Sequence, residues 1–251
     1  MRKEIPGRAR GRFQAKAVIL AGGRGTRLAP YTTFFPKPLV PIGERPILEI
    51  IVRQLVRAGI GDIVLSIGHL GELIKAYFNN GNCRIPGLNL AYQRESRALG
   101  TAGPLADIPD LDRTFLVMNG DVLTDLDYRT LLDYHEDQHA MLTIAMHTKE
   151  VHTDLGVLKT DRRGRLLSYD EKPIHKYNVS MGIYIYSSKV LDYIPRGRYL
   201  DFPDLVQRLL KHGEKVVGFP TQSYWLDIGR REDYELAQQE FQSENPPFRL
   251  V

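Results

Sequence analysis

The stretch KAVILAGGRGTRL, residues 16–28, joins a run of apolar residues to a cluster of glycines and arginines. The run at 16–21 is apolar almost throughout, which is typical of a parallel strand covered on both faces of its sheet. Glycines at the carboxyl end of the first strand of an α/β sheet lie where such sheets bind their ligands. We therefore expect an α/β fold whose first strand leads into a binding loop.

Short apolar runs alternate with helical patterns through the rest of the chain. Further strands are expected at 62–67, 88–93, 114–118, 141–147, 156–160, 165–170, 179–187, 215–220 and 223–227. Helices are expected at 47–56, 70–78, about 101–106, 128–137, 202–212 and 231–242. The alternation in the first half predicts crossover units on a parallel sheet. We predict a Rossmann-like fold, with helices flanking a mainly parallel central sheet and a smaller β region in the second half.

Length and composition exclude several classes of protein. The chain has 251 residues, of which 43% are hydrophobic and 25% charged, so it is neither disordered nor fibrous. A single cysteine, Cys83, excludes a disulfide framework and a zinc site of several cysteines. No apolar run approaches the roughly 20 residues that span a bilayer, and the run at 17–21 is too short for a signal peptide. We expect a cytoplasmic protein that binds no membrane.

The net charge of +4 is concentrated at the start of the chain. Residues 1–16 hold six basic side chains against Glu4 alone, so the remainder sums to −1. We interpret residues 1–16 as a flexible basic tail, with an anion-binding or partner-binding arm as the alternative. A near-neutral remainder does not favour a nucleic-acid partner.

The glycine cluster at 22–25 has the chemistry of a phosphate-binding loop. Without side chains, glycine backbone N–H groups can approach phosphate oxygens closely. Arg24, Arg27 and Lys37 add positive charge, and the prolines on either side of Lys37 fix where that side chain originates. The spacing matches neither a Walker loop nor a dinucleotide fingerprint. A purely structural turn is the alternative.

Two aspartates follow predicted strands and are candidate metal ligands. Asp121 follows the strand at 114–118, and Asp227 ends the strand at 223–227. Two carboxylates facing a triphosphate are the usual way to hold Mg²⁺, although each could instead cap a strand or helix. His135, Glu136 and His139 have the spacing of an H-E-x-x-H motif, but no apolar face sets the two histidines apart. We interpret their helix as having a solvated face.

Five motifs, in order, carry a resemblance to a known family. They are LAGGRGTRL at 20–28 with PKPL at 36–39, LGTAG at 99–103, NGD at 119–121, EKP at 171–173 and WLDIG at 225–229. In these motifs the chain resembles the sugar-1-phosphate nucleotidyltransferases, and is closest in pattern to the members that act like mannose-1-phosphate guanylyltransferase. The resemblance spans residues 17 to about 240.

The resemblance implies roles for individual residues. The catalytic residues that it implies are Arg27, Lys37 and Asp121. Its nucleotide-binding residues are Ala21, Gly22, Gly23, Gly25, Thr26, Arg27, Glu95, Gly100, Thr101 and Asp121. Its sugar-phosphate-binding residues are Gly156, Glu171, Lys172 and Asn178, which makes the β region of the second half a sugar-binding region. Its Mg²⁺ ligands are Asp121 and Asp227.

The resemblance also implies the reaction. A sugar 1-phosphate oxygen attacks the α-phosphorus of a nucleoside triphosphate, giving a nucleotide sugar and pyrophosphate. GTP with mannose 1-phosphate or a heptose-type phosphate is the first expectation, and dTTP or UTP with a glucose-type phosphate is the alternative. A noncatalytic regulatory subunit that binds nucleotide sugars is a further alternative.

The expected organisation is a single nucleotidyltransferase domain over 17–245. No hexapeptide repeat follows it, so we expect no C-terminal β-helix domain. The family leads us to expect self-association into a homo-oligomer.

Overall fold

Strand β1 (Lys16–Ala21) lies inside a seven-stranded sheet of order β12-β8-β11-β6-β1-β4-β5. Val18 packs into the apolar cluster on one face, and Ala17 and Ile19 into the cluster on the other. Successive side chains of a strand point to opposite faces, so an uninterrupted apolar run suits a strand with both faces covered. The predicted two-sided burial of the first strand is confirmed.

The computed structural model describes residues 15–80, 83–95, 97–111, 113–243 and 246–248. The basic tail predicted over 1–16 falls outside these ranges except for its last two residues. Besides β1, the strands are β2 (Pro41–Ile42), β3 (Arg45–Pro46), β4 (Asp62–Ile67), β5 (Asn89–Arg94), β6 (Phe115–Asn119), β7 (Val122–Thr124), β8 (Leu142–His152), β9 (Val157–Thr160), β10 (Leu166–Asp170), β11 (Ile174–Tyr186), β12 (Val216–Thr221) and β13 (Trp225–Asp227). The α-helices are α1 (Ile47–Arg57), α2 (Gly71–Asn79), α3 (Tyr128–Gln138), α4 (Phe202–Lys211) and α5 (Arg231–Phe241), and the 3₁₀ helices are η1 (Thr26–Leu28), η2 (Lys37–Leu39), η3 (Gly103–Asp107) and η4 (Ser188–Tyr193).

The sheet is mainly parallel, as predicted. β6, β1, β4 and β5 form a parallel block, and β12 is parallel to β8. Only β11 runs against its neighbours, β6 and β8. A parallel block places the carboxyl ends of its strands along one edge, where α/β proteins bind ligands.

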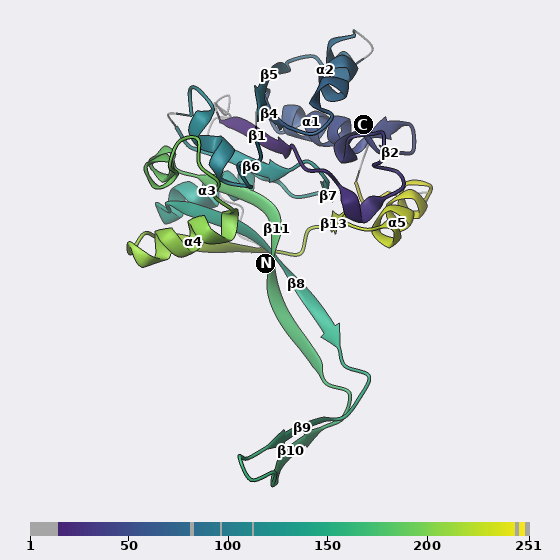
Figure 1. Ribbon diagram of the computed structural model, residues 1–251, viewed down its shortest axis with the longest axis vertical. Helices are drawn as coiled ribbons and strands as arrows, with labels where there is room; N and C mark the ends of the chain where they lie inside the picture. The colour runs from purple at the N-terminus through teal and green to yellow at the C-terminus, as the bar shows by residue number, and fades with distance from the viewer. Residues whose placement is uncertain (1–14, 81–82, 96, 112, 244–245, 249–251) are drawn as a thin grey trace, which may run out of the picture.

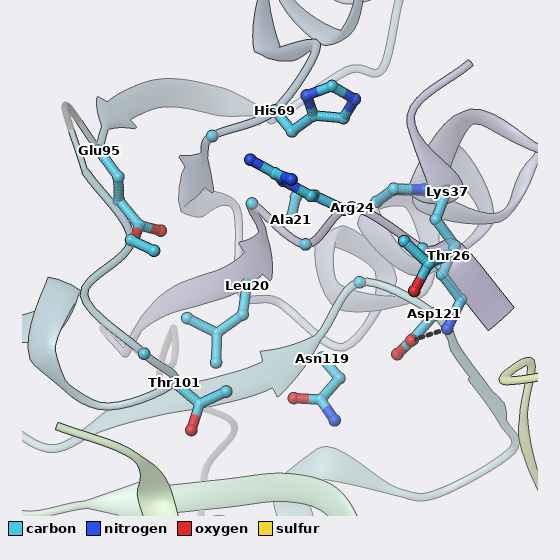
Figure 2. Close-up of a pocket in the computed structure, with 18 of the residues that line it drawn as sticks. Leu20, Ala21, Arg24, Thr26, Lys37, His69, Glu95, Thr101, Asn119 and Asp121 are labelled. Atoms are coloured by element: carbon cyan, nitrogen blue, oxygen red, sulfur yellow. Dashed lines mark hydrogen bonds and ion pairs between the residues drawn. The ribbon is translucent and has the colours of Figure 1, made fainter. Parts of the chain in front are cut away.

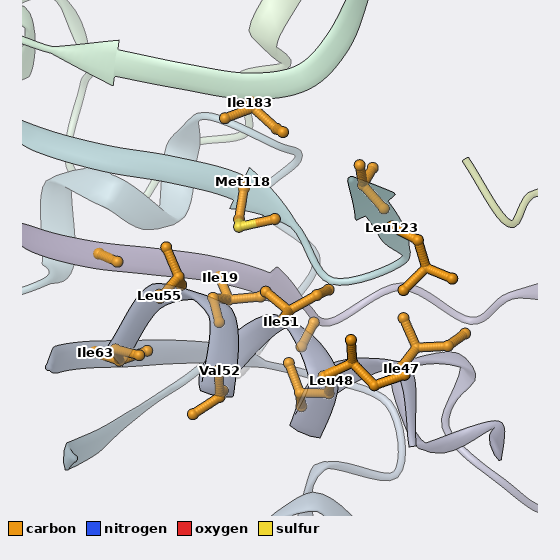
Figure 3. Close-up of a cluster of buried hydrophobic side chains, with 14 of the residues drawn as sticks. Ile19, Ile47, Leu48, Ile51, Val52, Leu55, Ile63, Met118, Leu123 and Ile183 are labelled. Carbon is orange, nitrogen blue, oxygen red and sulfur yellow. The ribbon is translucent and has the colours of Figure 1, made fainter. Parts of the chain in front are cut away.

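Helices cover both faces of the sheet (Figure 1). On one face, α1 buries Ile47, Leu48 and Ile51 in a cluster with Ile19 and Met118 (Figure 3). On the other face, buried side chains of η3, η4 and α4 pack against those of the strands. This architecture confirms the α/β, Rossmann-like prediction.

The second half contains a two-stranded ribbon that leaves the sheet. The outer parts of β8 and β11, residues 148–152 and 174–178, pair only with each other, and the hairpin of β9 and β10 lies beyond them. We call residues 148–178 the arm; Figure 1 shows it projecting from the body. The strands predicted at 141–147 and 179–187 were therefore too short. The sequence of the arm is largely polar, so it lacks the apolar pattern of a strand that packs on a core.

Two further local predictions were wrong. The helix expected at about 101–106 is the 3₁₀ helix η3. Gly100 has a left-handed φ of 80°, and the N–H groups of Ala102 and Gly103 bond the carbonyl of Leu200 instead of a preceding turn. His135 is not on a solvated face: it is buried, and its Nδ1 lies 2.8 Å from Thr143 Oγ1.

Over the ranges that the structure describes, every helix is too short or too polar to cross a membrane.

Candidate active site

The main cavity, of about 730 Å³, opens at the carboxyl ends of β1, β4 and β6. Figure 2 shows Lys37, Thr26 and Asp121 on one side of it and Glu95 and Thr101 on the other. All the residues that the sequence predicted for the nucleotide line it, and so does Lys37: Ala21, Gly22, Gly23, Gly25, Thr26, Arg27, Glu95, Gly100, Thr101 and Asp121. Gly229 also lines this cavity, so the structure brings together residues from four of the five motifs.

Two glycines in the loop cannot readily be replaced. Gly25 has a φ of +63°, and a Cβ there would lie 2.9 Å from Lys37 Cβ. A Cβ at Gly22 would lie 2.9 Å from Glu95 Oε1 and 3.3 Å from the Gly68 backbone nitrogen. The glycines therefore allow a left-handed turn at one position and close packing at the other. Both keep the loop tight against the two walls of the cavity.

Lys37 and Asp121 form a largely buried ion pair in the cavity. Their side chains are 10% and 21% exposed, and Lys37 Nζ donates a short hydrogen bond to Asp121 Oδ2. Pro36 and Pro38 flank the lysine in η2, which restricts the backbone from which it extends. Asp121 Oδ1 is buried and has no hydrogen-bond partner among the described residues. A buried carboxylate oxygen without a partner is costly unless a ligand or ion satisfies it.

Asp227 approaches Asp121 from another part of the chain. β13 pairs with β7, and the backbone N–H of Ile228 donates to the carbonyl of Asp121 at 3.0 Å. Burial raises the pKa of the Asp227 carboxyl, and the charge of Asp121 raises it further, while Lys37 and Arg27 oppose the shift. A cation placed between the two carboxylates would remove their repulsion.

Asp227 lines a second cavity, of about 310 Å³, beside the first. Thr101 and Asn119 line both cavities, so the two adjoin. The second cavity is also lined by Ser180, Met181, Gly182, Tyr184, Phe202, Pro203 and Trp225. The indole Nε1 of Trp225 donates to the carbonyl of Met181 at 2.9 Å, which fixes the ring. This second space can take a polar ligand that also has an apolar face.

The wall opposite Lys37 is held by hydrogen bonds. Glu95 accepts from Ser66 Oγ at 3.1 Å and from the Leu99 backbone N–H at 3.2 Å. The Thr101 N–H donates to Asp201 Oδ1 at 3.1 Å, and Thr101 Oγ1 accepts from the Phe202 N–H at 2.8 Å. Both side chains are positioned by the chain itself, before any ligand binds.

The residues predicted to bind the sugar phosphate lie elsewhere. Gly156, Glu171 and Lys172 belong to the arm, and Asn178 is on the part of β11 that leaves the body. Glu171 accepts from Tyr169 Oη at 2.7 Å, and Asn178 Oδ1 accepts from Thr148 Oγ1 at 3.3 Å. A Cβ at Gly156 would lie 2.3 Å from Tyr169 Oη. The structure gathers these residues on the arm but does not place them at either cavity.

Several side chains that line the main cavity were not predicted from the sequence. They are His69, Arg97, Asn119 and Tyr199. His69 lies just after β4, as the glycine loop lies just after β1. Because α/β sheets bind ligands at the carboxyl ends of their strands, His69 could also have been predicted. Asn119 ends β6 and is the first residue of the NGD motif, in which only Asp121 was given a role. Arg97 and Tyr199 lie in loops and carry no such signal.

The donors present fit a small divalent cation bound partly by a ligand. The described residues contain no cluster of three or more His, Cys, Asp or Glu side chains that could hold a metal alone. Asp121 and Asp227 supply carboxylate oxygens, one of them buried and unpaired. Mg²⁺ typically takes one or two carboxylates, with phosphate and water completing its shell.

A glycine loop at the strand ends, flanked by cations and two carboxylates, gives this α/β protein the chemistry of a phosphate-binding site. The Nucleotidyl transferase family matches residues 16–244, and the chain belongs to that family.

Curated relatives agree in class but differ in substrate. The UTP–glucose-1-phosphate uridylyltransferase of Synechocystis sp. is 37% identical over 239 residues, covering 87% of this chain and 61% of that protein. The mannose-1-phosphate guanylyltransferase of Mycobacterium tuberculosis is 34% identical, covering 88% and 63%. The chain thus spans about three fifths of the length of these two relatives. The D-glycero-alpha-D-manno-heptose 1-phosphate guanylyltransferase of Aneurinibacillus thermoaerophilus is 32% identical over 231 residues, covering 90% of this chain and 98% of that protein.

Among solved structures, HddC from Yersinia pseudotuberculosis complexed with GMP-PN is similar in fold. Its TM-score is 0.71 at 28% sequence identity, and the match covers 91% of this chain and all of HddC.

Proposed function

We propose that this chain transfers a nucleotidyl group from a nucleoside triphosphate to a sugar 1-phosphate and releases pyrophosphate. The observation that carries the proposal is the single cavity in which the glycine loop, Arg27, Lys37 and Asp121 meet. Membership of the family and the activities named for its relatives support the same reaction class.

The chemistry needs orientation and charge neutralisation more than a strong base. The attacking oxygen belongs to a phosphate monoester that is already an anion, so little proton transfer is required. Two anions must instead be held in line, and the leaving pyrophosphate must be stabilised. The loop amides and Lys37 bind the triphosphate, and the Arg27 guanidinium can engage two oxygens of the leaving group.

Asp121 and Asp227 would hold Mg²⁺, which when bound neutralises charge on the phosphates. Lys37 fixes the orientation of the Asp121 carboxylate through Oδ2 and leaves Oδ1 for the ion. Burial and the charge of Asp121 raise the pKa of the Asp227 carboxyl, and a bound cation would lower that pKa.

The sugar phosphate is assigned to the arm and the second cavity. Lys172 would pair with the monoester phosphate, and Glu171 and Asn178 would accept from sugar hydroxyls. The backbone at Gly156 would approach the sugar. Trp225 and Met181 give the second cavity an apolar side against which a sugar ring can pack.

For the substrates, GTP with mannose 1-phosphate or a heptose-type phosphate is the first candidate pair. The heptose relative, which this chain covers almost completely, supports that choice. UTP with glucose 1-phosphate is the second candidate, because the relative from Synechocystis has the higher identity.

A pyrophosphate-release assay tests the proposal. The wild-type chain is incubated with Mg²⁺, each of the five common triphosphates and a panel of sugar 1-phosphates. We expect release with at least one guanine or uracil pair and none when the sugar phosphate is left out. Nucleotide binding without release for any pair would favour a noncatalytic, regulatory protein.

A further inference from the structure

A short segment from the second half of the chain, residues 197–201, packs against the LGTAG loop of the main cavity. We call this segment the strap. The backbone N–H groups of Ala102 and Gly103 donate to the carbonyl of Leu200 at 2.9 and 3.0 Å. The N–H of Leu200 in turn donates to the carbonyl of Leu99 at 2.9 Å. These backbone hydrogen bonds hold the strap against a loop that is distant from it in the sequence.

The strap explains why the LGTAG loop contains two glycines. A Cβ at Gly100 would lie 2.5 Å from the carbonyl oxygen of Leu200. A Cβ at Gly103 would lie 2.6 Å from the carbonyl oxygen of Arg198. Both distances are too short for a real side chain against a backbone, so glycine is what lets the strap approach this closely. The strap is therefore a built part of the cavity wall.

Asp201 connects the strap to two side chains that line the cavity. Its Oδ1 accepts from the Thr101 N–H, and its Oδ2 accepts a short hydrogen bond from the hydroxyl of Tyr199. The carboxylate raises the pKa of the Tyr199 hydroxyl, so the hydroxyl keeps the proton that it donates. Because one carboxylate holds both groups, Tyr199 is fixed relative to Thr101.

Tyr199 offers an aromatic ring to the main cavity. It lines the cavity beside Arg97 and Thr101, and it is 61% exposed even though its hydroxyl is held. Arg97 donates a short hydrogen bond to the carbonyl of Gly197, which ties the first residue of the strap to the same wall. A ring that is already fixed loses little conformational entropy when a flat ligand group packs on it.

The two sides of the cavity suit different parts of one ligand. Figure 2 shows Lys37 and Asp121 on one side, and Glu95 and Thr101 on the other. The lysine and the neighbouring glycine loop suit phosphates. The opposite wall offers a carboxylate that can accept from N–H groups, together with the ring of Tyr199. A nucleobase has N–H donors at its edge and two flat faces, so it complements this wall.

We propose that Tyr199 packs its ring on the nucleobase of the bound nucleotide, and that Asp201 is the positioning residue for this ring. The proposal rests on the proposed function, because it takes the cavity to be a nucleotide site. Every nucleobase has a flat face, so stacking of this kind depends little on which base is bound. Tyr199 thus contributes affinity for the nucleoside part of the substrate and none for its phosphates.

Calorimetric titration in the absence of any sugar phosphate tests the stacking role. The wild-type chain, Tyr199→Ala and Tyr199→Phe are titrated with GTP, UTP and inorganic tripolyphosphate, each with Mg²⁺. We expect Tyr199→Ala to raise the Kd of the tighter-binding nucleotide roughly tenfold, on the scale of one base–aromatic stack. The Kd of tripolyphosphate should not change. Tyr199→Phe keeps the ring and should stay within about threefold of the wild type, because one exposed hydrogen bond contributes little.

Leu210→Ala, which removes a 51% exposed side chain of α4 outside the cavity, is the matched control. If Tyr199→Phe bound nucleotide as weakly as Tyr199→Ala, the proposal would be overturned, since both variants lose the hydroxyl and only one loses the ring. An equal loss of tripolyphosphate affinity in Tyr199→Ala would also overturn it, because the phosphate side would then have changed too.

A double-mutant cycle tests the role of Asp201. If Asp201 acts through the ring, Asp201→Asn should weaken nucleotide binding less in the Tyr199→Ala background than in the wild type. Equal losses in the two backgrounds would overturn the positioning role. If the wild type bound nucleotide through Tyr199 but released no pyrophosphate with any sugar 1-phosphate, the proposed function would fail and the stacking proposal would hold.

Discussion

The cavity and the arm carry the same kinds of charged residue in opposite surroundings. Lys37 and Asp121 are largely buried and paired, and the loop around them is fixed by packing. Glu171 and Lys172 are exposed at the end of a ribbon that only its own ladder supports. The residues of the main cavity are thus held in place within the body, whereas the residues proposed for the sugar phosphate lie outside both cavities.

The largest effect is expected from Asp121→Asn, which tests the preorganised half. Removing the charge weakens the cation site and leaves buried Lys37 without its carboxylate partner. We expect kcat/KM to fall about 10³-fold, on the scale of losing one strong electrostatic contact in the transition state. Pyrophosphate release measures this, with Asp133→Asn on the exposed face of α3 as control. Near-normal activity would remove Asp121 from the metal site.

The next prediction concerns His135, which is buried and contacts Thr143 in the part of β8 that lies in the body. Burial lowers the pKa of His135 to about 4, below the ordinary value of 6.5. The unfolded chain therefore takes up a proton before the folded one does, so stability is lost as pH falls from about 6.5 toward 4. The loss is about 3 kcal/mol, and it is absent above pH 7.

Chemical denaturation at several pH values checks the histidine prediction. We expect His135→Gln to flatten the dependence, because glutamine does not titrate. His152→Gln, on the exposed arm, is the control and should leave the slope as in the wild type. Equal slopes for all three chains would show that His135 titrates normally.

Arg27→Ala should lower kcat at saturating substrates by about 10²-fold, because the pyrophosphate loses its guanidinium contact. Arg27→Lys keeps the positive charge but loses the planar guanidinium, so its kcat should lie between those of the wild type and of Arg27→Ala. Steady-state kinetics at saturating substrates separates these cases, with exposed Arg57→Ala as the control. Wild-type turnover in Arg27→Ala would contradict the role.

The smallest effect is expected from Lys172→Ala on the arm. An exposed lysine that meets a phosphate contributes on the order of a tenfold change in KM for the sugar phosphate. Nucleotide affinity and thermal stability should stay unchanged, because the cavity is built without the arm. Lys159→Ala, also exposed on the arm, is the matched control. Weaker nucleotide binding in Lys172→Ala would show that the two regions are not independent.

Much of the body was predictable from sequence because burial leaves a periodic signal. The apolar run of β1 and the spacing of α1 follow directly from packing against a two-sided sheet. Asp121 lies near Asp227 because β7, which begins directly after Asp121, pairs with β13, which Asp227 ends. His69 lies just after β4 but belongs to no motif that was recognised.

The hairpin of the arm was predicted, since the strands expected at 156–160 and 165–170 match β9 and β10, but the ribbon that carries it was not. Its strands are extended by a ladder between backbones, and their side chains, such as Lys149 and Lys176, do not alternate between core and solvent. The direction in which such a ribbon leaves the sheet depends on tertiary contacts that local sequence does not encode. The family resemblance could therefore suggest Lys172 as a site residue without locating it.

Hydrogen exchange of the wild-type chain tests the central claim, that the nucleotide site is preorganised in the body and separate from the arm. A triphosphate with Mg²⁺ alone should slow exchange at 21–28 and 95–101 and leave the arm, 148–178, unchanged. Adding the sugar 1-phosphate should then slow exchange at 171–178. Protection of the arm by the nucleotide alone, with none in the glycine loop, would contradict the account.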